Sequence, residues 1–330
     1  MPSRFRVFAA FTIICLVWGS TFLAIRFAIE TIPPVLMAGI RFLSAGLILF
    51  VAAGRKAERP SIAHWRSAAI IGVALFLFGN GLVTWSEERV PSGIASLFVA
   101  IIPVWFVLLE WLRHNGGRPR RPVLAGLILG FAGILLLVGR NPFSNGHHID
   151  LFGAGALLIS GICWANGSLY SRKANLPSSQ FLTASMEMLA GGLALVLAGT
   201  LMGEWQRFEL SGVSLRSWVS LAYLSVFGSI IAFTAYIWLL RAISPSRVAT
   251  YAYINPIVAL FLGSVFAGEK LSPQVFAAAG VIVIAVILIV TTKSKSASTS
   301  VRKKLSDSPL PLAVLKSQPA DFPSAERDRP

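Results

Sequence analysis

The chain has 330 residues, of which 55% are hydrophobic and only 13% are charged. Because an ordinary soluble domain carries about 25% charged residues, this composition excludes a soluble enzyme. The formal net charge of +15 comes from Lys and Arg in short clusters between long apolar runs, which is typical of a protein that crosses a membrane several times. Both cysteines, Cys15 and Cys163, lie inside apolar runs, so the sequence supports no disulfide framework and no cysteine metal site.

Ten apolar stretches are long enough to cross a bilayer, whose hydrocarbon core of about 30 Å needs about 20 residues per helix. In chain order, we predict transmembrane helices over residues 7–29, 34–53, 67–85, 93–111, 123–139, 151–170, 181–202, 218–240, 248–266 and 274–291. Most of the 29 basic residues then fall on one side of the membrane. Because positively charged loops stay cytoplasmic, this bias predicts that both termini are cytoplasmic. Residues 293–330, rich in Ser, Pro and charge, are expected to form a disordered cytoplasmic tail.

The chain contains a weak internal repeat. The residues matched at an offset of 146 include Trp18 with Trp164, Leu43 with Leu189 and Gly46 with Gly192, and those matched at an offset of 153 are Trp85 with Trp238 and Pro103 with Pro256. Residues 5–140 and 150–292 therefore form two repeats of five helices each. Since five is odd, the second repeat enters the membrane from the other side. We predict an all-α polytopic membrane protein with ten transmembrane helices as two inverted-topology five-helix repeats.

Four short motifs carry a family resemblance. They are Trp18-Gly19-Ser20-Thr21, Arg41-Phe42, the Tyr-Ala-Tyr-Ile-Asn-Pro of residues 251–256 and the Gly-Glu-Lys-Leu-Ser-Pro of residues 268–273. In order and spacing they resemble the EamA family of the drug/metabolite transporter superfamily. The resemblance implies ten helices in two inverted repeats and the export of small metabolites or drugs across the inner membrane. The family often ends the fourth helix of each repeat with Gly-Glu; the second repeat has Glu269 there, whereas the first has Gly116.

Arg41 and Glu187 occupy equivalent positions of the two repeats, inside apolar helices where ionisable groups are rare and face a cavity or a partner. Helix rise places their levels on the order of 11 Å apart, and their side chains lean in opposite directions along the membrane normal. A salt bridge between them is therefore not expected. We predict that Arg41 faces an external vestibule and Glu187 a cytoplasmic one. The alternative is that both side chains snorkel to the interface without touching a solute.

Two tryptophans, Trp18 and Trp164, lie near the midplane, where an interfacial aromatic belt cannot explain them. The small polar residues beside them, Ser20, Thr21 and Asn166, either line a cavity or pack helices closely.

Pro103 and Pro256 lie well inside their predicted helices, so each is expected to interrupt the hydrogen-bond ladder near the midplane. Freed backbone at that depth is tolerated where it is buried in protein or lines a water-filled cavity. The polar and aromatic groups around the second break make it our best candidate for a binding site; they are Tyr251, Tyr253 and Asn255. Asn80, also near the midplane, allows the same reading. The alternative at each proline is a plain helix kink.

Three further features have simpler interpretations. Gly126 and Gly130 have the spacing that permits close helix contact, either within the chain or in a homodimer. The charged turn over residues 87–89 is expected to be solvated. His147 and His148 lie in a loop with no matching third ligand, so no metal is expected.

These patterns together favour a secondary transporter that works by alternating access, with the bilayer and a small-molecule solute as partners and with no cofactor and no nucleic acid. No phosphate-binding Walker motif occurs, so the energy would come from a gradient or from the solute itself. A small amphipathic or zwitterionic solute, such as an amino acid or aromatic metabolite, suits the candidate residues best. The alternatives are a nucleotide-sugar or other metabolite importer or exchanger, an intramembrane enzyme and a non-transporting scaffold.

Overall fold

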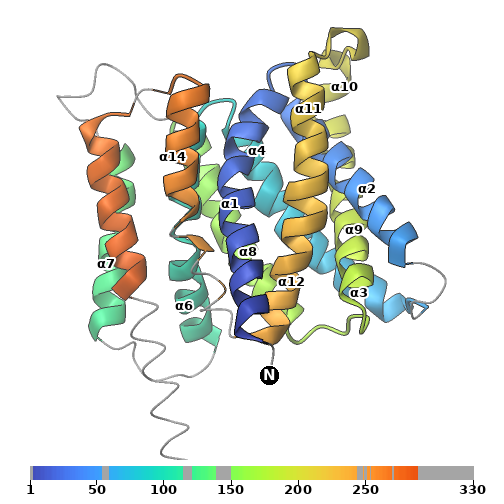
Figure 1. Ribbon diagram of the computed structural model, residues 1–330, viewed down its shortest axis with the longest axis horizontal. Helices are drawn as coiled ribbons and strands as arrows, with labels where there is room; N and C mark the ends of the chain where they lie inside the picture. Colours follow the sequence, from blue (N-terminus) through green and yellow to red (C-terminus); the bar gives the residue numbers. More distant parts are fainter. Residues whose placement is uncertain are drawn as a thin grey trace, which may run out of the picture. The chain divides into compact units, whose positions relative to one another are not determined.

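The computed structural model describes residues 3–53, 59–113, 121–138, 150–243, 248, 251–252, 254–269 and 271–288. Within these residues all regular secondary structure is helical (Figure 1). In this described part of the chain, seven helices are long and apolar enough to cross a membrane, and three apolar helices are shorter. The all-helical, polytopic prediction is therefore confirmed. The predicted cytoplasmic tail, residues 293–330, lies outside the described residues.

The helices follow the predicted order closely. Those of the first repeat are α1 (Arg4–Ala28), α2 (Pro34–Ala53), α3 (Ile62–Gly72) continued by η1 (Val73–Gly81) and α4 (Leu82–Ser86), α5 (Ser92–Val99), α6 (Ile102–Arg113) and α7 (Arg121–Val138). Those of the second repeat are α8 (Leu151–Ser171), α9 (Gln180–Leu201), the short α10 (Glu204–Arg207) and η2 (Leu210–Gly212), α11 (Leu215–Tyr223) continued by η3 (Leu224–Ile231) and α12 (Ala232–Ala242), α14 (Asn255–Phe266) and a last helix, Pro273–Leu288.

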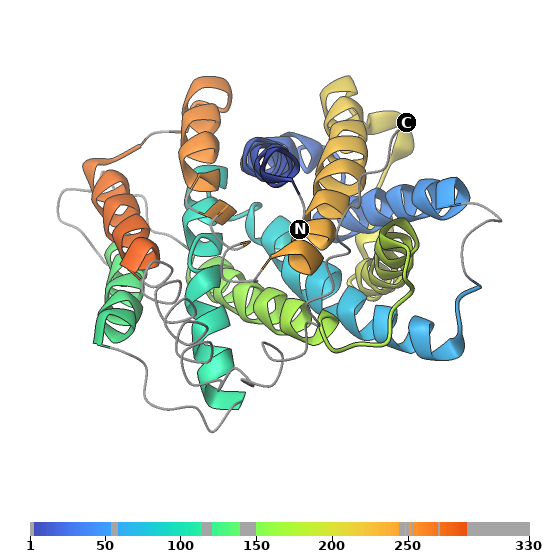
Figure 2. The same ribbon diagram turned by 60° about the horizontal axis from the view of Figure 1, so that its bottom comes forward.

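The two repeats meet where α2 and α9 lie side by side (Figures 1 and 2). A Cβ added to Gly192 would lie 3.0 Å from Cγ of Leu43, and one added to Gly46 would lie 3.0 Å from Cγ of Leu189. The partner number falls as the α2 number rises, so the helices cross antiparallel. The two contacts exchange under the offset of 146, which means that a pseudo-twofold axis of the inverted repeat passes through this crossing.

The third helix of each repeat contains a π-helical segment, η1 in the first and η3 in the second. In η1 the Asn80 amide donates to the carbonyl of Leu75 at 3.4 Å, and in η3 the Ser229 hydroxyl donates to the carbonyl of Leu224 at 3.1 Å. Each side chain thus bonds the carbonyl five residues back, the i→i−5 spacing of a π-helix. The sequence did not reveal these segments, because a π-helix keeps the apolar composition of the helix around it.

Each helix-breaking proline lies in the first turn of the helix that follows a break. Pro103 is the second residue of α6, and Pro256 is the second residue of α14. A proline is tolerated there because its missing N–H needs no partner in a first turn. The predicted helix over residues 248–266 is interrupted in its described part: Val248 is helical, Tyr251 and Ala252 have 3₁₀ geometry, and α14 begins at Asn255.

Two carboxylates of the second repeat cap helices of the first. Glu204 accepts the backbone N–H of Leu36 at 2.7 Å at the start of α2. Glu269, the residue of the family motif, accepts the N–H and hydroxyl of Ser92 at 2.7 and 2.6 Å and the N–H of Gly93 at 3.0 Å, at the start of α5. A negative charge at a helix N-terminus is stabilising, so both contacts tie the repeats together.

Of the two spaced glycines on α7, Gly130 allows close contact with neighbouring helices of the same chain. A Cβ added to Gly130 would lie 3.3 Å from the side chain of Val104 on α6 and 3.8 Å from Ala285 of the last helix. Gly126 is also buried. The close approach that small residues allow is therefore used between α7 and its neighbours (Figure 2).

Candidate substrate-binding site

A cavity of about 650 Å³, with the open solvent at its mouth included, lies between the two repeats. We call it the central cavity. Its walls come from helices of both halves, including α1, α2 and η1 of the first repeat and α8 and η3 of the second. The predicted binding residues that line it are Trp18, Thr21, Arg41, Asn80, Trp164, Tyr251 and Asn255. Val99 lines it as well. Its carbonyl is four residues before Pro103, which has no N–H to donate to it.

Arg41 is held in a fixed position on the cavity wall. Its side chain is buried, and its Nε donates to the hydroxyl of Ser229 at 2.9 Å. The guanidinium carbon lies 4.5 Å from the ring centre of Phe42, and Nη2 lies 2.9 Å from the point where a Cβ on Gly228 would sit. Its Nη1 is buried and has no hydrogen-bond partner among the described residues. One donor of this cation is therefore unused within the described part of the chain.

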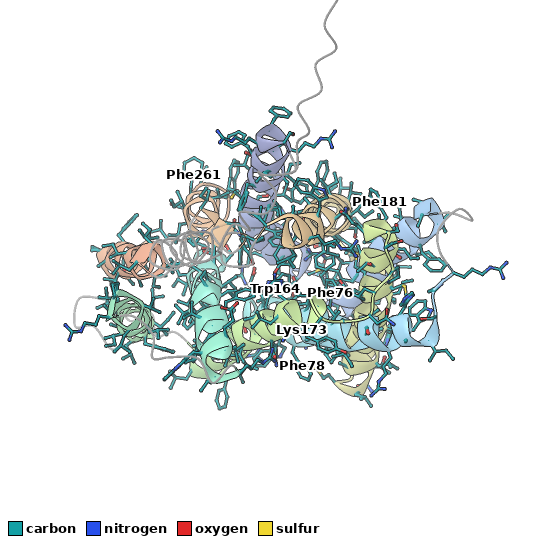
Figure 3. All side chains as sticks on the ribbon, turned by 90° about the horizontal axis from the view of Figure 1, so that it is seen from below. Phe76, Phe78, Trp164, Lys173, Phe181 and Phe261 are labelled. Atoms are coloured by element: carbon teal, nitrogen blue, oxygen red, sulfur yellow. The ribbon has the colours of Figure 1, made fainter. Side chains whose placement is uncertain are left out.

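Aromatic rings form the end of the cavity that is nearer to the start of α1. Trp18 and Trp164, equivalent residues of the two repeats, meet edge to face with ring centres 5.6 Å apart, and the indole N–H of Trp18 donates to the carbonyl of Gly228 at 3.0 Å. The ring of Tyr251 lies 5.0 Å from Trp18. Figure 3 shows Trp164 and Phe76 in the interior of the bundle, whereas Phe181 and Phe261 lie at its periphery.

A second cavity, of about 1060 Å³ with the open solvent at its mouth included, lies toward the face of the molecule where α1 begins. Ser178 lines this second cavity and also lines a groove that contains Arg6, at the start of α1. The second cavity therefore lies on the side of the molecule where α1 begins. Glu187 lies on its wall with Arg241, whose guanidinium donates to the hydroxyl of Thr183 at 3.1 Å. Arg41 and Glu187 therefore line separate cavities.

A layer of aromatic side chains, Trp18, Trp164, Phe233, Tyr236 and Tyr251, separates the two cavities; we call it the aromatic layer. Phe233 lines both cavities. Tyr236 is fully buried, with its ring centre 5.1 Å from that of Trp18 and 5.7 Å from that of Trp164. Its hydroxyl shares a hydrogen bond of 2.9 Å with Ser168.

Three of the predicted residues lie elsewhere than in the central cavity. The hydroxyl of Ser20 bonds that of Tyr223 at 2.6 Å, between α1 and α11. Asn166 is exposed on α8 and accepts a hydrogen bond from Arg113. Glu187 belongs to the second cavity. The positions that fall outside the described residues are Tyr253, Gly116, His147 and His148.

The charged turn over residues 87–89 differs from its predicted solvated state. Glu88 is partly exposed and pairs with Arg89 at 3.2 Å and with Arg207 at 3.3 Å. Glu87, which directly follows the end of α4, is fully buried, and neither carboxylate oxygen has a hydrogen-bond partner among the described residues. Burial, together with the neighbouring Glu269, raises the pKa of the Glu87 carboxyl well above its ordinary value. Because residues 87–89 are all charged, the sequence did not indicate which of the three side chains is buried.

The model of the EamA-like transporter family matches residues 7–139 and again residues 151–291. The chain belongs to this family. It is 38% identical over 287 residues to the Escherichia coli protein "Uncharacterized inner membrane transporter YedA", covering 85% of this chain and 90% of that protein. It is 27% identical over 281 residues to the Salmonella typhimurium protein "Probable amino-acid metabolite efflux pump", covering 82% of this chain and 90% of the relative.

The fold is likewise shared with a solved crystal structure. The TM-score is 0.61 at 19% sequence identity, and the match covers 87% of this chain and 96% of the other. The family match and the Escherichia coli relative confirm the predicted resemblance: the protein is a multi-pass inner membrane transporter of the drug/metabolite transporter superfamily.

Proposed function

We propose that this transporter exports small amphipathic metabolites, such as amino acids and related solutes, or drugs, and that it binds them in the central cavity. The observation that carries the proposal is the position of this cavity, between the two repeats and on one side of the aromatic layer. Midplane sites at the interface of inverted repeats are typical of secondary transporters. The name of the Salmonella relative also specifies efflux.

The arrangement of the two cavities supports alternating access. In an exporter with both termini in the cytoplasm, the second cavity is the cytoplasmic entrance and the central cavity leads outward. Rocking of the repeats about the crossing of α2 and α9 would part the aromatic layer and close the outer side. The hydrogen bond between Ser168 and Tyr236 would have to break in that step, since it joins α8 to α12 at the closed side.

The composition of the cavity wall limits the solute. Arg41 is the one charged residue among the described residues that line it, and aromatic rings and the amides of Asn80 and Asn255 supply most of the remaining recognition chemistry. This favours a small solute with an apolar body and one or two polar groups. A nucleotide sugar, with two phosphate charges, would meet too few cations.

The test is transport by the purified protein in proteoliposomes, with a panel of amino acids and aromatic metabolites, measured with and without a pH gradient. At least one solute should move faster than in protein-free vesicles. Gly79→Leu, which fills the central cavity beside Trp164, should abolish that movement. The matched control is Gly155→Leu on α8, where a Cβ meets nothing within 4 Å. The proposal fails if no solute moves, or if the Gly79 variant transports normally.

The cytoplasmic location of the termini has its own test. A green fluorescent protein fused after residue 330 should fluoresce in cells, because it folds in the cytoplasm, whereas an alkaline phosphatase fused there should stay inactive. The reverse pattern would contradict the proposed direction of the two cavities.

A further inference from the structure

The central cavity has a positive charge that no described residue pairs with directly. The buried carboxyl of Glu87 interacts electrostatically with Arg41, but it accepts no hydrogen bond from it and does not line the cavity. Arg41 makes no salt bridge with any residue that the structure describes. Three acidic groups of the second repeat are engaged elsewhere: Glu204 and Glu269 hold helix N-termini, and Glu187 lines the second cavity. No carboxylate stands among the described residues that line the central cavity.

The guanidinium is also arranged for a ligand rather than for packing alone. Its Nε is engaged by Ser229, Gly228 leaves room beside Nη2, and the ring of Phe42 covers one face. Nη1 remains, buried and without an acceptor in the described part of the chain. A charged donor in a low-dielectric site that lacks an acceptor is unfavourable, and an anionic oxygen placed there would form a strong charge-assisted hydrogen bond.

We propose that the transporter recognises its solute through a single carboxylate, which binds Nη1 of Arg41, while an apolar or aromatic body packs against Trp18 and Trp164. The inference rests on the proposed function and specifies its substrate class. A carboxylate fits because its two oxygens are compact acceptors for a guanidinium. A second charge on the solute is not required, since the described residues of the wall offer no carboxylate to an ammonium group.

The experiment compares three probes that share a phenyl ring. They are 3-phenylpropionate with only a carboxylate, phenylalanine with both charges, and phenethylamine with only an ammonium group. Binding to the purified full-length protein is measured by isothermal titration calorimetry. We expect the first two probes to bind and phenethylamine to bind at least tenfold more weakly.

Variants of Arg41 and of its partner Ser229 test whether this guanidinium binds the carboxylate. Arg41→Gln should weaken binding of 3-phenylpropionate by about tenfold to a hundredfold, the range for a hydrogen bond to a charged group. Arg41→Lys, which keeps the charge without the planar fork, should lose less. Ser229→Ala, which releases Nε but keeps the charge, should lie between wild type and Arg41→Gln. The matched control is Arg216→Gln, which removes a surface cation paired with Glu30.

The outcomes separate this inference from the transport function. It is overturned if phenethylamine binds as tightly as 3-phenylpropionate, if neither acid binds the wild type, or if the acids bind Arg41→Gln as they bind the wild type. In each case, movement of other solutes in proteoliposomes would leave the transport proposal standing. If Arg41→Gln does not fold, Ser229→Ala and Arg41→Lys carry the test, and unchanged binding in both also overturns the inference.

Discussion

The two repeats share a scaffold but not its chemistry, as positions 41 and 187 show. Arg41 on α2 and Glu187 on α9 are equivalent under the offset of 146, and their helices cross through contacts that exchange under the same offset. Yet Arg41 lines the central cavity and Glu187 the second one. A pseudo-twofold fold thus presents Arg41 on one side of the aromatic layer and Glu187, together with Arg172 and Arg241, on the other, so the two cavities differ in their chemistry.

A second difference concerns how each side is held. In the second repeat, Ser168 on α8 shares a hydrogen bond with Tyr236 of the aromatic layer. Its equivalent in the first repeat is Phe22, which has no hydroxyl and lines the central cavity. The side where α1 begins is therefore tied by a hydrogen bond that the other side lacks at this position.

The acidic residues differ between the repeats as well, and Glu87 gives the largest expected effect. Glu204 and Glu269 of the second repeat accept backbone N–H groups, whereas Glu87 of the first has no hydrogen-bond partner among the described residues and faces the charges of Glu269, Arg26 and Arg41. Its pKa is raised in the folded protein, so above pH 4.5 the unfolded chain loses this proton first. Stability should therefore fall as pH rises above 4.5, by on the order of 1 kcal/mol per pH unit, until the folded carboxyl ionises.

Glu87→Gln should remove this decline. The measurement is the thermal unfolding of the purified protein in detergent between pH 5 and pH 8, with Glu88→Gln as the neighbouring control, because Glu88 is partly exposed and paired. We expect the Glu87→Gln variant to lose less stability toward pH 8 than the wild type, and the Glu88→Gln variant to follow the wild type. Identical profiles for all three proteins would mean that Glu87 is solvated in the native state.

The shared scaffold itself can be broken at the crossing of α2 and α9. Gly192→Ala should destabilise the protein by about 1 to 3 kcal/mol, because its Cβ would lie 2.8 Å from the backbone nitrogen of Leu43, which cannot move aside. Gly46→Ala should cost less, since its nearest contacts with Leu189 are at 3.0 Å. Gly155→Ala, which meets nothing, should be neutral or slightly stabilising. Denaturant unfolding in detergent measures the three; equal effects would refute the tight crossing.

Much of the scaffold follows from the sequence because it depends on composition and spacing. Apolar runs of sufficient length located the helices, and α2 was predicted to the residue at both ends. The matched pairs Leu43 with Leu189 and Gly46 with Gly192 are the residues that interlock at the pseudo-twofold axis. Small residues recur there because two backbones approach closely.

The cavity wall was harder to predict, because depth in the membrane does not fix the direction of a side chain. Ser20 and Thr21 are neighbours at one depth, yet Ser20 faces α11 and Thr21 lines the cavity. The rotation of a transmembrane helix is set by its packing against other helices. Phe76 and Phe233 of the wall are apolar residues in apolar helices, so no sequence signal distinguished them.

The smallest expected effect concerns the tie that only the second repeat has. Removing the Tyr236 hydroxyl leaves that of Ser168 without its buried partner, and the reverse holds for Ser168→Ala. Each single variant should therefore lose about 1 kcal/mol of stability, and the double variant Ser168→Ala with Tyr236→Phe should lose less than the sum. A double-mutant cycle on denaturant unfolding measures this coupling.

If the hydrogen bond between Ser168 and Tyr236 also holds the cytoplasmic side shut, Tyr236→Phe should raise the labelling rate of a cysteine placed at Phe233, whereas Phe22→Tyr should leave it unchanged. Additive losses together with unchanged labelling would show that the hydrogen bond does not link α8 to α12.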